Sequence, residues 1–268
     1  VAEWPDNPVA RRVAIDYLAW AEDTPAALAE LDRAIAAEPD MLEFHLLKLR
    51  LLSQSGEAEP VGAQLQVMQE TFPENEQVRD LLIRWHMSRR DFDAAEALLR
   101  KIAGDPTGPA GMHLALAQFL EQVRGTDAAR EELGRLISAN EDQPNGDLYR
   151  ATLAGLEFND GDHAGAIAAI EGILRDAEPS DQTRRIKLAL AKMLEATGNR
   201  VGARSRVEEI LEEDTTNVEA LRMRAEWLID EDRTRDAILD LRAALDQDPR
   251  DSATLMLMAR AHQREGDL

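Results

Sequence analysis

A pattern of about 34 residues recurs along the chain and restricts its fold more than any other feature. Units begin at Pro8, Leu42, Glu76, Ala110, Asp147, Arg184, Val218 and Ser252, with steps of 34, 34, 34, 37, 37, 34 and 34 residues. A fixed period of this length is typical of repeat proteins, in which each unit buries its apolar face against its neighbours. We therefore predict one elongated domain over residues 1–268, with seven complete units and a half unit from residue 252.

Each unit contains two apolar stripes with helical spacing. Positions 3, 7, 8, 10 and 11 of a unit, counted from its first residue, lie on one face of a first helix, and positions 20, 24, 27 and 28 lie on one face of a second helix. Position 10 is apolar throughout: Tyr17, Leu51, Trp85, Phe119, Leu156, Met193, Trp227 and Ala261. The pattern predicts a pair of antiparallel helices in each unit.

Glycine and proline stand where such a helix pair must turn. Position 15 is Gly56, Gly161 and Gly198 in three units, and a residue after a helix end often adopts a positive φ that glycine tolerates. Position 32 is Pro39, Pro73 and Pro249 in units one, two and seven, where proline ends the second helix. These residues support the same frame that the apolar positions define.

In this frame the chain resembles the tetratricopeptide-repeat family over essentially its whole length. The unit from Val218 to Asp251 carries the resemblance most clearly, through Leu221, Ala225, Ala237, Leu241, Ala244 and Pro249. The chain departs from the family pattern at position 24, which is never aromatic, and units four to six lack proline at position 32. The resemblance implies an all-α protein, a right-handed α-solenoid (superhelix) of antiparallel helix pairs.

The composition excludes several classes of function. The chain has no cysteine, so disulfides and thiolate chemistry are excluded, and its formal charge of −21 disfavours nucleic acid as a partner. No segment approaches the roughly 18 consecutive apolar residues of a membrane helix. The acidic surface fits either a basic partner or a solvated surface that keeps the protein soluble. Residues 1–7 resemble the end of a preceding unit, so we expect a piece of a longer protein; its compartment, cytoplasmic or periplasmic, stays open.

The sequence contains no recognisable arrangement of catalytic or metal-binding residues. Five histidines are scattered without the i, i+4 spacing of a helical zinc site, and phosphate-binding loops and nucleophile elbows are missing. The acidic turn 230–232 lacks the glycine and terminal glutamate of a calcium loop. We expect a non-catalytic protein without a cofactor or metal.

The resemblance also implies where a ligand would bind, because first helices line the concave groove of such arrays. Positions 5, 9, 12 and 13 then contribute the predicted groove residues: Arg12, Trp20, Arg50, Gln54, Arg84, Ser88, Gln118, Phe158 and Lys192. Arginine in a groove suits carboxylate groups, which its guanidinium binds through two hydrogen bonds. The alternative is pairing within the protein, for example between Arg222 and Glu226 on one helix face.

We therefore predict a protein-interaction scaffold that binds a peptide or protein segment in its groove, in the assembly of a bacterial complex. One alternative is a structural spacer or self-association module. Another is the regulatory arm of a larger enzyme, such as an envelope or polysaccharide-related protein. The sequence leaves the oligomeric state open.

Overall fold

A computed structural model describes residues 8–21, 23–56, 58–141 and 143–266, with no account of the side chains of residues 8–10. The expected end of a preceding unit, residues 1–7, lies outside the described residues. Fifteen α-helices and no strands are found in the part of the chain that the structure describes. They form two compact parts of the chain, residues 1–102 and residues 103–268. We call these parts unit 1 and unit 2, with numerals, to distinguish them from the repeat units of about 34 residues.

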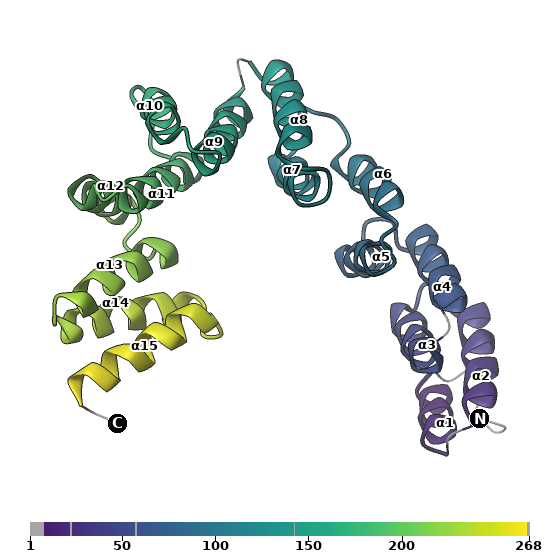
Figure 1. Cartoon of the computed structure of the whole chain (residues 1–268). Helices are drawn as coiled ribbons and strands as arrows, with labels where there is room; N and C mark the ends of the chain where they lie inside the picture. Colours follow the sequence, from purple (N-terminus) through teal and green to yellow (C-terminus); the bar gives the residue numbers. More distant parts are fainter. Residues whose placement is uncertain (1–7, 22, 57, 142, 267–268) are drawn as a thin grey trace. The chain divides into compact units, whose positions relative to one another are not determined.

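In unit 1, the helices follow one another as pairs (Figure 1). Their bounds are α1 Pro8–Trp20, α2 Thr24–Ala37, α3 Leu42–Ser55, α4 Ala58–Thr71, α5 Glu76–Ser88 and α6 Phe92–Ala103, whose last residue belongs to unit 2. Ile15, Leu31 and Phe44, from α1, α2 and α3, share one buried cluster. Leu65 of α4 shares the next one with residues of α3 and α5. Each cluster joins consecutive helices.

Unit 2 repeats this arrangement. Its helices are α7 Ala110–Arg124, α8 Thr126–Ala139, α9 Pro144–Asn159, α10 His163–Leu174, α11 Asp181–Ala196, α12 Arg200–Glu213, α13 Val218–Asp230, α14 Thr234–Gln247 and α15 Ser252–Glu265. Buried apolar residues of α9 to α13 form one cluster, which Ala244 of α14 joins, and those of α13, α14 and α15 form another. Burial therefore passes from each helix pair to the next, as in an α-solenoid. The all-α prediction is confirmed.

The extra residues in the two 37-residue steps partly lengthen helices. Helices α9 and α11 begin at Pro144 and Asp181, three residues before the predicted unit starts at Asp147 and Arg184, and each has 16 residues. At Ser180, a reciprocal pair of hydrogen bonds with Thr183 fixes the start of α11. The extra residues therefore add about one turn to these two first helices.

Position 15 adopts a left-handed backbone in several units, and in two of them the residue there is not glycine. Gly56, Gly161 and Gly198 have φ values of 76°, 105° and 82°, which confirms the expectation for these glycines. Arg90 and Asp232 occupy the same position with φ of 60°. A side chain makes this conformation unfavourable by roughly 1–2 kcal/mol. The turn is therefore imposed by helix packing in these two units.

Candidate functional site

First helices line a groove in unit 2, on α11, α13 and α15. The groove is lined by Lys192, Glu219, Arg222, Met223, Glu226, Ala253, Met256 and Leu257 and encloses about 440 Å³. These residues occupy positions 2, 5, 6 and 9 of three successive units. We call this surface the first-helix groove.

Capping residues fix where α13 and α15 begin. The side chain of Asn217 accepts a hydrogen bond from the Ala220 amide at 3.1 Å, and Asp251 accepts one from the Thr254 amide at 3.1 Å. Such caps satisfy amides that have no partner within the helix. Helices α13 and α15 also contact each other directly. Because positions 2, 5, 6 and 9 lie on one helical face, the contact places these residues of the two helices side by side.

The floor of the groove is apolar. Met223 and Leu257 are half-buried, whereas the side chain of Met256 is 74% exposed. Methionine is flexible and polarisable, so it adapts to differently shaped apolar partners. An exposed methionine among other apolar residues is therefore suited to bind an apolar side chain.

Ion pairs that link neighbouring first helices, or a first helix to the cap of the next one, border the floor. Lys192 Nζ lies 2.7 Å from Glu219, Arg222 Nη1 lies 3.2 Å from Asp251, and Arg260 lies 3.6 Å from Glu226. In place of the Arg222–Glu226 pair considered as an alternative, Arg222 pairs with the cap of α15, and Glu226 pairs with Arg260 on α15. Exposed ion pairs contribute about 1 kcal/mol or less. Charges of a ligand can therefore replace them at small cost.

Asp251 stays ionised at the edge of the groove. The Thr254 hydroxyl hydrogen bond lowers the pKa of Asp251 below its usual range, against a smaller opposing effect of burial. Amides of the first turn of α15 and the charge of Arg222 lower this pKa further. Asp251 therefore orients Arg222 while it caps α15.

Solved structures supply the comparison with known proteins. No protein-family model and no curated protein matches the sequence significantly. A tetratricopeptide repeat protein from Parabacteroides merdae superposes with a TM-score of 0.54 at 12% identity, over 95% of this chain and 98% of that chain. The chain has the tetratricopeptide-repeat fold. This confirms the fold that the resemblance implied.

Two further solved structures that the comparison found have longer chains. A monomeric mutant of IFIT1, solved with Gppp-AAAA, has a TM-score of 0.50 at 14% identity, over 97% of this chain and 66% of that chain. The Cut9–Hcn1 hetero-tetramer of the APC/C has a TM-score of 0.45 at 16% identity, over 89% of this chain and 52% of that chain. The chain thus spans about half to two thirds of their length.

Three predicted groove residues belong to unit 2. Lys192 lines the first-helix groove. Gln118 is exposed on α7. Phe158 is half-buried, packs against the core of unit 2 and stacks on His163 with ring centroids 4.4 Å apart. Of these three, Lys192 alone lines the groove described above.

The six others belong to unit 1. Arg12 pairs with Asp16 and Glu43. Arg50 and Gln54 are exposed on α3, and Arg84 is exposed on α5, where its Nε donates to the Asp80 carbonyl at 3.2 Å. No carboxylate among the described residues forms an ion pair with Arg50 or Arg84. These two arginines therefore have guanidinium groups available for an external carboxylate.

Two predicted residues of unit 1 lie at helix ends. Ser88 is exposed, and its hydroxyl donates to the Trp85 carbonyl at 2.7 Å. Trp20 ends α1 and is 79% exposed, and its ring centroid lies 6.1 Å from that of Tyr17. The Ser88 hydroxyl is thus occupied by a hydrogen bond within its own helix, whereas the Trp20 ring is available to contact a partner.

The sequence reasoning missed the apolar floor of the groove. Met223 and Leu257 occupy position 6, which it did not assign to the groove, and Met256 occupies position 5, which it did. The available signal was an apolar residue at position 6 in both of the last two units, together with Met256 at position 5 of the last one.

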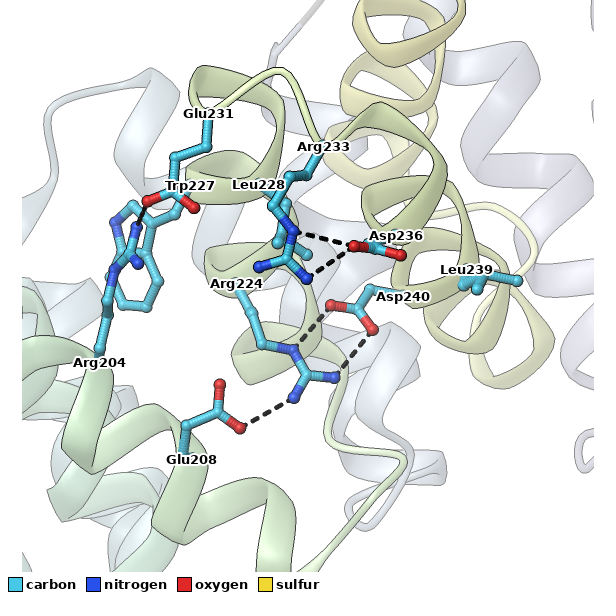
Figure 2. A pocket seen from close by; sticks show the side chains of 10 residues that line it. All are labelled: Arg204, Glu208, Arg224, Trp227, Leu228, Glu231, Arg233, Asp236, Leu239 and Asp240. Atoms are coloured by element: carbon cyan, nitrogen blue, oxygen red, sulfur yellow. Dashed lines mark hydrogen bonds and ion pairs between the residues drawn. The ribbon is translucent and has the colours of Figure 1, made fainter.

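A second depression, of about 330 Å³, lies between α12, α13 and α14 (Figure 2). At its centre, Arg224 donates two hydrogen bonds to Asp240, both 2.8 Å long, and a third to Glu208 at 2.9 Å. The hydrogen bonds from Arg224 to Asp240 are the main reason why the pKa of Arg224 is raised. The guanidinium of Arg224 is thus held by carboxylates of the protein itself, and it links α12, α13 and α14.

The rest of this depression is also paired. Arg233 bonds Asp236 at 2.6 Å, and Arg204 pairs with Glu231 while its guanidinium lies 5.4 Å from the centre of the Trp227 ring. Figure 2 shows the ion pairs on the walls of the depression. Because each arginine already contacts a carboxylate, we assign this depression a structural role.

The described residues contain no group of three or more side chains that could hold a metal ion. Within the same residues, no helix has the length and apolar character needed to cross a membrane.

Proposed function

We propose that this protein is an interaction scaffold that holds a peptide or protein segment in the first-helix groove. The observation that carries the proposal is the combination of an exposed apolar floor, including Met256 at 74% exposure, with bordering ion pairs that a ligand can replace. Grooves lined by successive helices commonly bind segments of other proteins through apolar anchors. The matching segment has an apolar anchor residue flanked by charged residues.

A polypeptide fits this groove better than a nucleic acid. Lys192 and Arg222 contact carboxylates of the protein, and the chain carries a net charge of −21. Binding to a phosphate backbone is dominated by free cations, which this groove does not offer. IFIT1 was solved with Gppp-AAAA, so an oligonucleotide of four adenosines is the natural control ligand.

The second part of the proposal is that unit 1 binds ligands that carry carboxylate groups. Arg50 and Arg84 are exposed and have no ion pair among the described residues. Each can bind a carboxylate through its planar guanidinium. That the partner belongs to a bacterial complex was inferred from the composition of the chain, and it stays a prediction.

The test is a selection of peptides from a random library on the intact chain. We expect Met256→Glu to weaken binding of the selected peptides about tenfold or more, because it places a charge on the apolar floor. Val201→Glu is the matched control, since Val201 is 83% exposed on α12 and does not line the groove. Peptides that bind Met256→Glu as tightly as the unchanged chain would refute the groove assignment.

A double variant tests the carboxylate preference separately. Arg50→Glu with Arg84→Glu should abolish binding of those selected peptides that are rich in Asp and Glu, and should leave the others unchanged. Equal binding of acidic peptides by this variant and by the unchanged chain would refute the second part alone. Competition by the tetra-adenosine oligonucleotide at low salt would contradict the choice of a polypeptide.

A further inference from the structure

A cleft runs between α9 and α10, in the fifth repeat unit. Its α9 wall carries positions 4, 7, 8 and 11, whereas the first-helix groove uses positions 2, 5, 6 and 9 of later units, so the two sites share no residue. The part between the helices encloses about 340 Å³, and a part of about 730 Å³ continues towards the loops before α9 and α11. Arg150 and Ile173 line both parts, which makes them one surface. We call it the α9–α10 cleft.

The apolar floor of this cleft is only partly covered by the chain itself. Leucine occupies position 7 of the third, fourth and sixth repeat units as Leu82, Leu116 and Leu190, which are 5%, 1% and 1% exposed. Leu153 has the same position in the fifth unit, lines the cleft and is only half-buried. The same residue type at the same position is therefore left less covered in this unit.

The reason lies at position 23, on the second helix of the pair. In other units this position carries a side chain that reaches the first helix. Gln64 donates a hydrogen bond to His45 at 3.0 Å in the second unit, and Asp240 accepts one from Arg224 at 2.8 Å in the seventh. In the fifth unit the residue is Ala169, which is exposed. Its methyl group is too short to cover the leucine of α9, so the cleft stays open.

Neighbouring repeat units are present on both sides, so this exposure does not come from an end of the array. Helix α8 contacts α9, and α11 contacts both α9 and α10 (Figure 1). The helices that stack on this pair are therefore already in place, and none of them fills the cleft. An occupant of the cleft comes from outside the stack of repeats.

Acidic side chains surround the cleft and indicate the charge of that occupant. Three of the carboxylates in its lining form ion pairs with arginines of the protein. Glu141, Asp162 and Glu178 also line it, from the loop before α9, the start of α10 and the loop after α10, and they form no ion pair among the described residues. Arg150 is held by the Asp147 carboxylate and the Glu141 carbonyl. The free charge of the cleft is therefore negative and complements a cationic ligand.

We propose that the α9–α10 cleft binds a basic segment of another protein, which places an aliphatic side chain over Ala169 and lysine or arginine beside the three unpaired carboxylates. The aliphatic side chain takes the place that Leu98 has at position 23 of the third unit, where it packs against the buried cluster that contains Leu82. Such an anchor in a cleft contributes most of the affinity of many interfaces. A second copy of this chain is disfavoured as the occupant, because each copy carries a net charge of −21.

The probe is a library of random peptides, selected on the intact chain that carries Met256→Glu. This substitution places a charge on the floor of the first-helix groove, so peptides that bind the groove do not dominate the selection. Selected peptides are dye-labelled, and their binding to variants is followed by fluorescence anisotropy. Light scattering reports the oligomeric state, and thermal unfolding reports whether each variant is folded.

We expect the selected peptides to carry a net positive charge and a leucine, isoleucine or methionine. Ala169→Leu fills the cleft with the residue type of Leu98 and should weaken binding about tenfold or more. Ala164→Leu is the matched control, because Ala164 is exposed on another side of α10.

The negative edge is tested separately from the floor. Glu178→Lys should weaken binding about tenfold, because it reverses a charge in the lining. Glu171→Lys makes the same change at an exposed position of α10 outside the lining and should leave binding nearly unchanged. Binding should also weaken as sodium chloride rises, because salt screens exposed charges.

Four results would overturn the proposal. The first is that no peptide is selected, and the second is that the selected peptides are neutral or acidic. The third is binding that Ala169→Leu and Glu178→Lys both leave intact; if Ala169→Leu does not fold, Glu178→Lys decides alone. The fourth is a dimer that Glu178→Lys dissociates, which would assign the cleft to a second copy. None of these results depends on whether the first-helix groove binds a ligand.

Discussion

The close approach of Gly62 to Trp85 allows the sign of a substitution to be predicted. Gly62 is buried within α4, where alanine should stabilise an ordinary helix by up to about 1 kcal/mol. A Cβ atom there would lie 2.4 Å and 2.7 Å from Cζ2 and Cη2 of the Trp85 ring. Overpacking a filled interface costs about 1–3 kcal/mol. We therefore expect Gly62→Ala to destabilise unit 1 by about 1 kcal/mol net.

Hydrogen exchange of amides in α4 and α5 measures this locally, since a repeat protein need not unfold in one step. Gly172→Ala is the matched control. Gly172 lies within α10, and an added Cβ atom would have no neighbour within 4 Å. There the helix preference acts alone, so the control should slow exchange in α10 by the equivalent of about 0.5–1 kcal/mol.

A double-mutant cycle identifies the cause. Trp85→Phe removes the ring atoms that an alanine at residue 62 would contact. In that background, Gly62→Ala should be neutral or stabilising, because the steric cost disappears and the helix preference remains. An unchanged loss of stability in the Trp85→Phe background would refute the steric explanation.

Three further predictions concern turns, ion pairs and pH. Arg90→Gly should raise stability by about 0.5–1 kcal/mol, because φ at Arg90 is 60°; a lower urea midpoint would contradict this. Asp240→Asn should lower the free energy of unfolding by about 1–2 kcal/mol, because it weakens two hydrogen bonds from Arg224. Asp236→Asn, in an exposed ion pair, should lower it by about 0.5 kcal/mol or less. Equal urea midpoints of the two variants would contradict this. The folded-state pKa of Asp251 is lowered, so the stability that its carboxylate contributes is present above the unfolded pKa and is lost as pH falls through the folded pKa. Amides of α15 should therefore exchange faster below about pH 4, and Asp251→Asn should reduce this acid dependence.

The helix pairs could be predicted because the same apolar positions recur in every unit. Leu31 and Leu241, both at position 24, are fully buried in different units. The turns were harder to predict where glycine is missing. Arg90 and Asp232 adopt a left-handed conformation that their own residue types disfavour, so helix packing decides the backbone there. Local sequence preference therefore indicates the turn at Gly56 and misses the turn at Arg90.

The candidate groove could be predicted only in part. Counting from each unit start assigned Lys192 to position 9, and Lys192 lines the first-helix groove. Its contact with a partner stays a prediction. The pairing of Arg222 with Asp251 depends on where α15 begins relative to α13, and the spacing of residues within one helix does not describe this. The role of Met223 also depends on how far apart two first helices lie. Such distances between units are properties of packing and are not encoded in the period.

The ion pairs between neighbouring units give each junction its own pattern of charges. Deletion of residues 184–217, one full period, would join unit five of the repeat directly to unit seven. Ile167 would then stand where Arg204 meets Trp227 and Glu231, and Gly155 would stand where Lys192 meets Glu219. The shortened chain would keep its period and lose complementary charges at the new junction. Each gain or loss of a repeat in such a chain therefore removes surface ion pairs at the new junction, a small loss of stability that later substitutions can restore.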